Sequence, residues 1–376
     1  MKIGLVCPYN IGLGGGVQEC VMAAQKELTK RGHTVHIITP LSREARENPP
    51  KGTILIGAGT DVRSPFSTTA QISASFNSEE LERILREHNF DILHFHEPWV
   101  PVLSRQLLSK SKSINVATFH ARMPDGVMTK TIETVITPYT KSILKTFDAL
   151  TAVSGPAAQY VQRLTSAPVQ IIPNGINLKK YRPKRTSENT ARSILFIGRL
   201  EKRKGVSLLI DAFARLNDKD TRLLIAGSGP DRDKLEDMVK SKRLHNVEFL
   251  GYITEKEKIR LLREASVFCS PAVYGESFGI VLLEAMACGA PTVAANNPGY
   301  VSVMQGRGLI SLVNPEDTEQ FARRLALMLY DKELASLFRK WAIKYVKQFD
   351  YITVVDEYEK LYKRLYKERK KQTAKT

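Results

Sequence analysis

Arg199 and Lys204 are the residues best placed to do chemistry on a phosphorylated substrate. Arg199 ends a short apolar run, and Lys204 opens the amphipathic stretch that follows. In doubly wound domains, strand carboxyl ends and helix amino ends border the ligand crevice, so both cations are placed to hold phosphate oxygens. A solvated basic turn is an equal alternative, because Lys202 and Arg203 lie beside them.

A second stretch, YGESFGIVLLEAMACG from Tyr274 to Gly289, carries two carboxylates. Glu276 falls in a glycine-flanked loop. Glu284 falls in an otherwise apolar helix, where a carboxylate is costly unless it is hydrogen-bonded. Two interpretations of Glu284 compete: a buried structural hydrogen bond, or an acceptor for ribose hydroxyls. The helix beginning near Phe278 also presents free amides to a pyrophosphate.

A glycine-rich loop, Gly12 to Gly16, separates the first apolar run from the first amphipathic stretch. Its backbone amides and the helix start that follows suit an anion. A dinucleotide cofactor would require an acidic residue at the end of the second strand, where Thr39 and Pro40 stand, so this role is disfavoured. The chain contains no P-loop motif.

Candidate metal ligands have simpler interpretations. His94 and His96 alternate with Phe95 at a strand end, so at most one is expected to face a cleft, and a metal pair is not expected. Asp231 and Asp233 open a helix, where acidic residues are ordinary caps. Four widely spaced cysteines are expected to be reduced, mostly buried thiols of a cytosolic protein: Cys7, Cys20, Cys269 and Cys288.

The elements that must position these residues follow an alternating strand and helix pattern. A chain of 376 residues suggests two domains. Lys2–Cys7, the glycine loop, an amphipathic stretch and Thr34–Thr39 form the unit of a parallel sheet buried on both faces. The same pattern predicts a helix over Ser78–His88 and further strands at Asp91–Phe95, Asn115–Phe119, Ala149–Val153 and Val169–Ile172.

The pattern lapses in a polar, proline-containing stretch and then restarts. Strands are expected at Ser193–Ile197, Arg222–Ala226, Val247–Leu250, Val267–Ser270 and Pro291–Ala294. The fold class is therefore α/β, with two Rossmann-like doubly wound domains. The expected boundaries are a first domain over 1–180, a linker over 181–192, a second domain over 193–350 and a basic amphipathic helix over 351–376.

Composition excludes several classes of protein. The chain is 43% hydrophobic, 8% aromatic and 25% charged, which is typical of soluble globular proteins and not of collagen, coiled coils, disordered chains or disulfide scaffolds. A net charge of +17 indicates an anionic partner: nucleic acid, a phosphorylated small molecule or a lipid surface. The longest apolar stretch, Gly279–Ala295, is broken by Glu284, so no membrane span is expected.

Seven motifs together resemble family 4 of the retaining glycosyltransferases. They are G-G-x-Q in the first loop, R-G-H before the second strand, H-x-H-E-P at His94–Pro98, A-T-F-H at Ala117–His120, P-N-G at Pro173–Gly175, G-R-x4-K-G and E-S-F-G-I-V-L-x-E-A-M. They cover nearly the whole chain in order. The stretches VCPYN, GGVQ, ILHFHEP, VATFH and GESFGIVLLEAMACG further resemble the bacterial phosphatidylinositol mannosyltransferases that use GDP-mannose.

The resemblance implies a GT-B fold, with the active site in the cleft between two domains and a C-terminal helix that returns to the first domain. It implies that Arg199 and Lys204 neutralise the donor diphosphate, that Glu284 holds the ribose, and that Glu276 holds a hydroxyl of the transferred sugar. His120 would contact the sugar near the reacting carbon. The implied catalytic group is therefore His120, Arg199, Lys204 and Glu276.

The resemblance also assigns supporting contacts. Gly16 would let the backbone approach the β-phosphate, and the other implied donor contacts are Phe278, Gly279 and Ile280. Tyr9 and Gln18 would bind the acceptor polyol. The family's lysine after the histidine is absent, and Arg122 is the candidate to replace it at a lipid phosphate. A second departure is Asn177, where the family carries Asp.

The chemistry fits these roles. Cleavage of a sugar–phosphate bond builds negative charge on the departing diphosphate, so fixed cations and helix amides lower the barrier without a metal or other cofactor. No residue stands out as the nucleophile of a double displacement. The family resemblance implies instead a front-face departure, in which the leaving phosphate accepts the proton of the acceptor.

The expected activity is transfer of a hexose, most readily mannose from GDP-mannose, to a phosphatidylinositol-type lipid by a cytoplasmic enzyme at the inner face of the membrane. The alternative enzyme uses UDP-glucose and acts on diacylglycerol or a soluble polyol. A nucleic-acid-binding protein is disfavoured, because no known binding module is present.

The C-terminal helix carries eight Lys or Arg against three Glu from Glu357 onward. It either packs on the first domain or also draws the enzyme to anionic lipid. The oligomeric state is not predicted.

Overall fold

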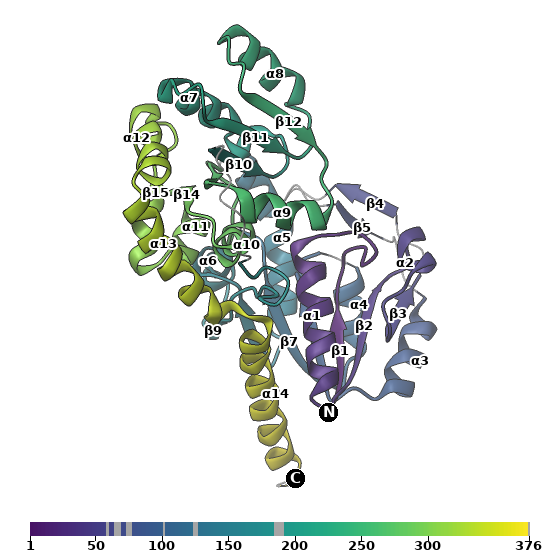
Figure 1. Cartoon of the computed structure of the whole chain (residues 1–376). Helices are drawn as coiled ribbons and strands as arrows, with labels where there is room; N and C mark the ends of the chain where they lie inside the picture. Colours follow the sequence, from purple (N-terminus) through teal and green to yellow (C-terminus); the bar gives the residue numbers. More distant parts are fainter. Residues whose placement is uncertain are drawn as a thin grey trace. The chain divides into compact units, whose positions relative to one another are not determined.

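The computed structural model describes residues 1–57, 60–63, 69–72, 77–100, 102–122, 127–183 and 192–374. The chain forms two compact units, which we describe one at a time (Figure 1). Unit 1 comprises Met1–Gly175 and Tyr351–Thr376, and unit 2 comprises Ile176–Asp350. The division lies at Gly175 and not at residue 180, because Tyr181 is buried within unit 2. Most of the expected linker, residues 184–191, lies outside the described residues.

Unit 1 is built on a seven-stranded sheet with the order β3-β2-β1-β6-β7-β8-β9, in which every pairing is parallel. The strands are β1 (Lys2–Val6), β2 (Thr34–Pro40), β3 (Thr53–Ile56), β6 (Ile92–His96), β7 (Ile114–Phe119), β8 (Ala149–Ala152) and β9 (Val169–Ile171). The helices are α1 (Gly16–Lys30), α2 (Arg43–Glu47), α3 (Ser78–His88), α4 (Leu103–Lys110), α5 (Val127–Leu144), α6 (Gly155–Gln162) and α14 (Tyr351–Thr373). A separate antiparallel pair joins β4 (Thr60–Arg63) and β5 (Thr69–Ile72).

Unit 2 contains a six-stranded parallel sheet with the order β12-β11-β10-β13-β14-β15. The strands are β10 (Ser193–Ile197), β11 (Arg222–Ala226), β12 (Val247–Gly251), β13 (Val267–Ser270), β14 (Thr292–Ala295) and β15 (Leu312–Val313). The helices are α7 (Val206–Leu216), α8 (Arg232–Ser241), α9 (Glu255–Glu264), α10 (Ile280–Cys288), α11 (Pro298–Val303), α12 (Thr318–Tyr330) and α13 (Lys332–Tyr345). The short 3₁₀ helices are η1 (Lys202–Lys204), η2 (Gly306–Ser311) and η3 (Val346–Phe349).

Both sheets have the doubly wound order, which confirms the predicted fold class of two Rossmann-like domains. The first strand of each unit lies in the middle of its sheet, between the second strand of the unit and a strand from its second half. The strand order therefore reverses between β1 and β6 in unit 1, and between β10 and β13 in unit 2. Open parallel sheets bind ligands at the carboxyl ends of the strands at such a point.

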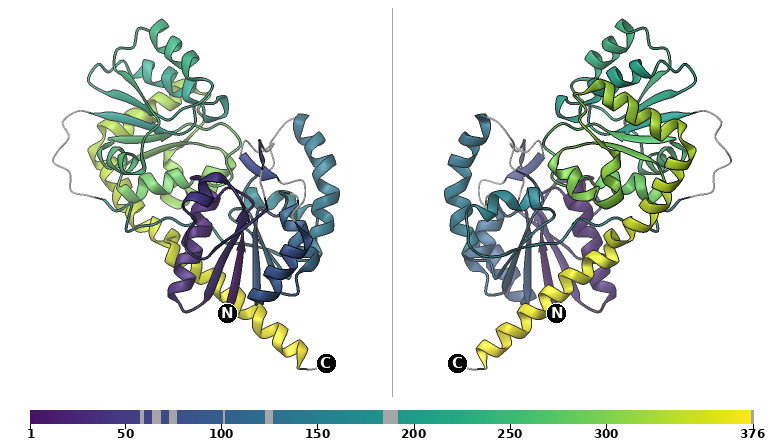
Figure 2. Two further views of the ribbon diagram at one scale, coloured as in Figure 1. Left: turned by 90° about the vertical axis from the view of Figure 1, so that its right-hand side faces the viewer. Right: turned by 90° about the vertical axis from the view of Figure 1, so that its left-hand side faces the viewer.

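Helix α14 confirms that the C-terminal segment returns to the first domain. Tyr358, Leu361, Tyr362 and Leu365 are buried, as the apolar stripe predicted, whereas Tyr366 is half-buried. Glu359 adds polar contacts, since it binds Arg31 at 3.0 Å and His33 at 3.0 Å. Figure 2 shows the end of α14 projecting past the sheet of its unit.

Two further sequence expectations concern membranes and thiols. Among the described residues, no helix combines the length and apolar character needed to cross a membrane. The four cysteines are free thiols, and only Cys20 is half-buried while the others are buried.

Candidate active site

In unit 2, two loops meet at the point where the strand order reverses. The loop after β10 carries Arg199 and Lys204, and the loop after β13 carries Glu276. Gly205 has a φ of +67°, and a Cβ there would lie 2.2 Å from the carbonyl oxygen of Pro271, so only glycine allows this approach. The amide of Val273 donates to the carbonyl of Arg203 at 2.9 Å, which joins the loops.

The charged side chains of these loops form one chain of ion pairs. Glu276 Oε1 lies 2.5 Å from Lys204 Nζ and 3.0 Å from Arg203 Nη1. Glu201 pairs with Arg203 Nε at 2.6 Å and lies 3.9 Å from Arg199 Nε. Three cations and two carboxylates leave one positive charge, and the Arg199 side chain is the exposed end, at 53% of its surface. Such a cluster can receive a dianionic group.

Arg203 is the residue of this cluster that the sequence alone did not identify. It was assigned only to a solvated basic turn, yet its side chain is 20% exposed and binds both Glu201 and Glu276. The turn is therefore built from ion pairs and is not simply a solvated one. The sequence signal that could have identified Arg203 is its position next to Lys204. The structure places both residues on the one-turn helix η1.

Glu284 lies in the middle of α10 and is 5% exposed. Its Oε1 accepts hydrogen bonds from Tyr181 Oη at 2.7 Å and Lys258 Nζ at 3.0 Å. Burial raises the pKa of Glu284, although Lys258 opposes this. Neighbouring Glu255 contacts the same two side chains. Oε1 of Glu284 therefore makes the buried hydrogen bonds that the structural interpretation expects.

The residues before α10 are positioned by packing. Phe278 is buried and its ring packs edge-on against Phe349, 6.0 Å between centroids. Gly279 has a φ of +107°, and a Cβ there would lie 2.7 Å from the ring of Tyr300. Ile280 begins α10, and no side chain among the described residues caps this helix start. Its first amides therefore have no side-chain acceptor and can meet an anion.

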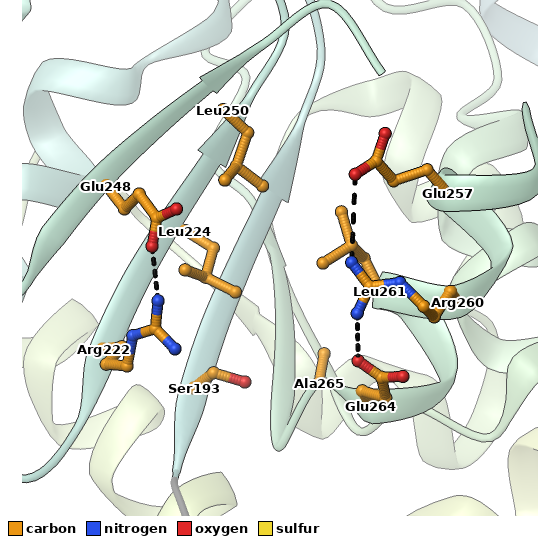
Figure 3. Close-up of a pocket in the computed structure, with 10 residues that line it drawn as sticks. All are labelled: Ser193, Arg222, Leu224, Glu248, Leu250, Glu257, Arg260, Leu261, Glu264 and Ala265. Atoms are coloured by element: carbon orange, nitrogen blue, oxygen red, sulfur yellow. Dashed lines mark hydrogen bonds and ion pairs between the residues drawn. The ribbon is translucent and has the colours of Figure 1, made fainter. Parts of the chain in front are cut away.

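Unit 2 also contains a hollow of about 180 Å³ near α9 (Figure 3). The hollow lies beside α9 along the sheet, where Leu224 and Leu250 line it as well as Ser193 and Arg222, and none of the candidate site residues lines it. Both of its arginines are already ion-paired, Arg222 with Glu248 and Arg260 with Glu264. We therefore do not assign it to the donor.

In unit 1, the first loop and the start of α1 hold the glycine predicted to lie near the β-phosphate, Gly16, and the two residues predicted to bind the acceptor, Tyr9 and Gln18. Helix α1 begins at Gly16 with no side-chain cap. Gln18 Nε2 donates to the carbonyl of Asn10 at 3.4 Å, so this side chain folds back over the loop. Tyr9 is buried, at 4% exposure, and its carbonyl accepts from Thr39 Oγ1 at 2.8 Å. Thr39 thus fixes the loop at the position where dinucleotide-binding proteins carry an acid.

His120 follows β7 and is 6% exposed. Its Nε2 lies 2.9 Å from Nδ1 of His96. Its backbone amide donates to the buried carboxylate of Glu97, which also accepts from the amide of Ala121 at 2.7 Å. Burial lowers the pKa of His120 to about 4 and raises the pKa of Glu97 to about 7. Arg122 is half-buried two residues further on, and the residues that follow it, 123–126, lie outside the described residues.

Two sequence interpretations need correction. The expectation that at most one of His94 and His96 faces a cleft assumed that their side chains alternate. This is wrong, because side chains two apart in a strand share a face, and their rings lie 4.2 Å apart. Asp231 does precede α8, but its side chain makes no capping hydrogen bond. Within the described part of the chain, no three His, Cys, Asp or Glu side chains are grouped to hold a metal ion.

Comparison with known proteins agrees with this architecture. Residues 14–180 match the description "Glycosyltransferase Family 4", and residues 178–345 match "Glycosyl transferases group 1". The chain is 30% identical to a phosphatidyl-myo-inositol mannosyltransferase of Mycobacterium leprae over 96% of each chain. It is 32% identical to the protein of that name from Propionibacterium freudenreichii, over 81% of this chain and 79% of the other.

Solved structures show the same fold. A glycosyltransferase from Rickettsia africae superposes with a TM-score of 0.78 at 20% identity, over 96% of this chain and 97% of that one. At that identity the likeness concerns the fold alone. Together, the motifs, the doubly wound units and the sequence relatives show that the chain is a hexosyltransferase of the GT-B fold and belongs to family 4 of the glycosyltransferases.

Proposed function

We propose that this enzyme transfers mannose from GDP-mannose to a phosphatidylinositol-type lipid, with retention at the anomeric carbon and without a metal ion. The observation that carries the proposal is 30% identity, over 96% of both chains, to a phosphatidyl-myo-inositol mannosyltransferase. The site residues that the motifs assign are all present in the sequence, with Arg122 as the substitute at the acceptor.

The charged cluster of unit 2 supports a diphosphate leaving group. Arg199 is exposed and Lys204 is held at Glu276, so two cations already stand at the strand ends where a diphosphate would bind. They act with the uncapped start of α10 on the charge that develops as the sugar departs. Glu276 holds Lys204 and accepts a hydroxyl of the transferred sugar.

Glu284 is proposed to bind the ribose through its second oxygen. The bonds from Tyr181 and Lys258 both reach Oε1. They fix the plane of the carboxylate, and we assign Oε2 to a ribose hydroxyl. The buried structural role and the ligand role therefore use different atoms of one side chain.

Unit 1 is proposed to supply the sugar and acceptor contacts. His120 contacts the sugar near the reacting carbon, and Gly16 lets the backbone approach the β-phosphate. Gln18 and Arg122 bind the acceptor headgroup. Tyr9 is 4% exposed, so only its edge is offered to the polyol. In the reaction, the anomeric carbon–oxygen bond to phosphate breaks, the acceptor oxygen bonds to the same face, and its proton passes to the departing phosphate.

Helix α14 is proposed to hold the enzyme against anionic lipid. Its buried stripe faces unit 1, while five exposed basic residues follow one another at helical spacing on the opposite side: Lys360, Lys363, Arg364, Lys367 and Lys371. Each basic residue near an anionic surface contributes about 1 kcal/mol. We place the enzyme at the cytoplasmic face of the membrane on this basis, as a peripheral protein.

A transfer assay tests the proposal. Purified enzyme receives radiolabelled GDP-mannose or UDP-glucose, with vesicles of phosphatidylinositol, vesicles of diacylglycerol in phosphatidylcholine, or soluble inositol, each with and without EDTA. We expect a labelled lipid only from GDP-mannose with phosphatidylinositol, and equal yields with EDTA. Product only from UDP-glucose, or only on diacylglycerol or inositol, would replace the proposed substrates, and loss of product with EDTA would overturn the metal-free mechanism.

A further inference from the structure

We infer that His96 is a positioning residue that fixes the tautomer of His120, so that Nδ1 of His120 carries the hydrogen offered to the substrate. The contact of His120 with substrate rests on the proposed function, whereas the tautomer does not. Neither His96 nor the network behind it belongs to the residues assigned above to donor or acceptor.

The directions of the hydrogen bonds behind His96 are determined by one backbone carbonyl. Thr151 Oγ1 donates to the carbonyl of Ala117 at 2.8 Å, because a carbonyl can only accept. Thr118 must then donate to Thr151, 2.6 Å away, and accept from His94 Nε2, also at 2.6 Å. His94 therefore carries its proton on Nε2, and its Nδ1 accepts from Tyr362 Oη at 2.6 Å.

This chain holds His94 as a fixed neutral ring against His96. Burial lowers the pKa of His94 to about 3, which agrees with a single ring proton at neutral pH. The ring of His94 packs on Tyr358 at 5.0 Å on one side and on His96 at 4.2 Å. His96 is 2% exposed and is thereby held with Nδ1 facing Nε2 of His120 at 2.9 Å.

The tautomer of His96 follows from its other ring nitrogen. His96 Nε2 is buried with no hydrogen-bond partner within the described residues. A proton there would be a buried N–H with no acceptor among its described neighbours, whereas the alternative places a proton on Nδ1 of His120, a ring that the side chain of Asn174 contacts so as to raise its pKa. We therefore assign the proton to Nδ1 of His96, which donates to Nε2 of His120. These assignments come from the hydrogen-bond network.

His120 is then neutral with its own proton on Nδ1. In the described structure this nitrogen has no hydrogen-bond partner of good geometry. The side chain of Asn174 is close enough to raise the pKa of His120, against the larger, opposite effect of burial. Nδ1 is therefore the ring nitrogen of His120 that carries a hydrogen not used by His96, and this is the hydrogen that we assign to a substrate oxygen. Removal of His96 would free His120 to adopt the other tautomer.

The experiment measures the tautomer and the kinetics in the same proteins. Long-range ¹H–¹⁵N spectra of the histidine-labelled, ligand-free full chain report which nitrogen of His120 is protonated. We compare the wild type with His96→Leu, which removes the hydrogen bond, and His96→Asn, whose amide can donate near the position of Nδ1. His36→Leu is the matched control, since His36 is a half-buried strand histidine of the same sheet.

We expect the Nδ1–H tautomer of His120 in the wild type, in His36→Leu and in His96→Asn, and a mixture of tautomers in His96→Leu. The kcat of His96→Leu should fall on the order of 10-fold to 100-fold with KM nearly unchanged, and His96→Asn should recover most of it. An Nε2–H tautomer in the wild type, or an unchanged kcat in His96→Leu, overturns the inference. If His96→Leu does not fold, the wild-type tautomer and His96→Asn still decide.

A separate variant distinguishes this inference from the proposed function. If His120→Ala transfers sugar as fast as the wild type, the proposed role of His120 fails, whatever its tautomer. If His120→Ala is inactive and His96→Leu is fully active, the role of His120 stands and the positioning role of His96 is wrong.

Discussion

The candidate residues of both units lie where the strand order of a doubly wound sheet reverses, but the electrostatic character of the two groups differs. In unit 2, Arg199, Lys204 and Glu276 are charged, partly exposed and held by ion pairs between adjacent loops. In unit 1, His96 and His120 are buried, and burial lowers the pKa of each so that they are neutral at pH 7. The contrast agrees with the proposed division of roles, in which the charged residues of unit 2 bind the diphosphate and unit 1 supplies neutral hydrogen-bonding groups.

The largest expected effect comes from removing charge in unit 2. Arg199→Ala and Glu276→Ala should each lower kcat by about 100-fold to 1,000-fold, because each removes a fixed group next to the developing charge. Steady-state transfer assays measure this, and circular dichroism should show an intact fold. Arg323→Ala, on the exposed face of α12, is the control and should be fully active. Full activity in either site variant would contradict the site assignment.

A smaller effect is expected from a substitution of Glu284. It tests whether this residue binds the ribose or only makes structural hydrogen bonds. Glu284→Gln keeps an oxygen for Tyr181 and Lys258 but weakens the acceptor for a ribose hydroxyl, so the Kd for GDP should rise about 10-fold, as for loss of a charge-assisted hydrogen bond. Calorimetric titration measures it. Glu255→Gln is matched, because Glu255 contacts the same two side chains. Equal loss of GDP affinity in both variants would mean that Glu284 acts only through packing.

The third effect is on stability and concerns the attachment of α14 to unit 1. Partial burial acts to raise the pKa of Glu359, but hydrogen bonds from Lys363, His33 and Arg31 outweigh it and lower the pKa to about 2. Because the folded pKa lies below the ordinary 4.5, this stabilisation is present above pH 4.5 and is lost as the pH falls toward 2.

Glu359→Gln should therefore lower the free energy of unfolding on the order of 1 to 2 kcal/mol at pH 7, and by less at pH 3. Urea denaturation at both pH values measures the difference. Glu319→Gln, which removes an exposed pair on α12, should change little at either pH. A Glu359→Gln deficit that grows toward pH 3 would refute the ion-pair account.

The two units also differ in how much of each site could be predicted from the sequence. The bounds of β10, β11, β13 and α3 agree with the expected ranges, because apolar runs and capping residues are local signals. The short edge strand β3 and the two-residue β15 were missed, since their apolar runs, ILI and LV, are too short to indicate a strand. In unit 2, Arg199, Lys204 and Glu276 lie on loops close to glycines, so their type and spacing could suggest the proposed roles.

Long-range contacts account for what the sequence did not predict. Tyr181 was expected to begin a linker, yet it is buried against Glu284, 103 residues away. The network behind His96 depends on Tyr362, which lies 268 residues from His94. No local pattern indicates such pairs. The relation of His94 to His96 was predictable, because alternation in a strand already places them on one face.

Calorimetric titration of GDP into the wild type, Arg199→Ala and His120→Ala tests the contrast between the two units most directly. If unit 2 provides the diphosphate contacts and unit 1 acts on the sugar, Arg199→Ala should lose GDP affinity by about 10-fold or more, and His120→Ala should bind GDP as the wild type does. Unchanged GDP binding by Arg199→Ala, or an equal loss in His120→Ala, would contradict this division of roles.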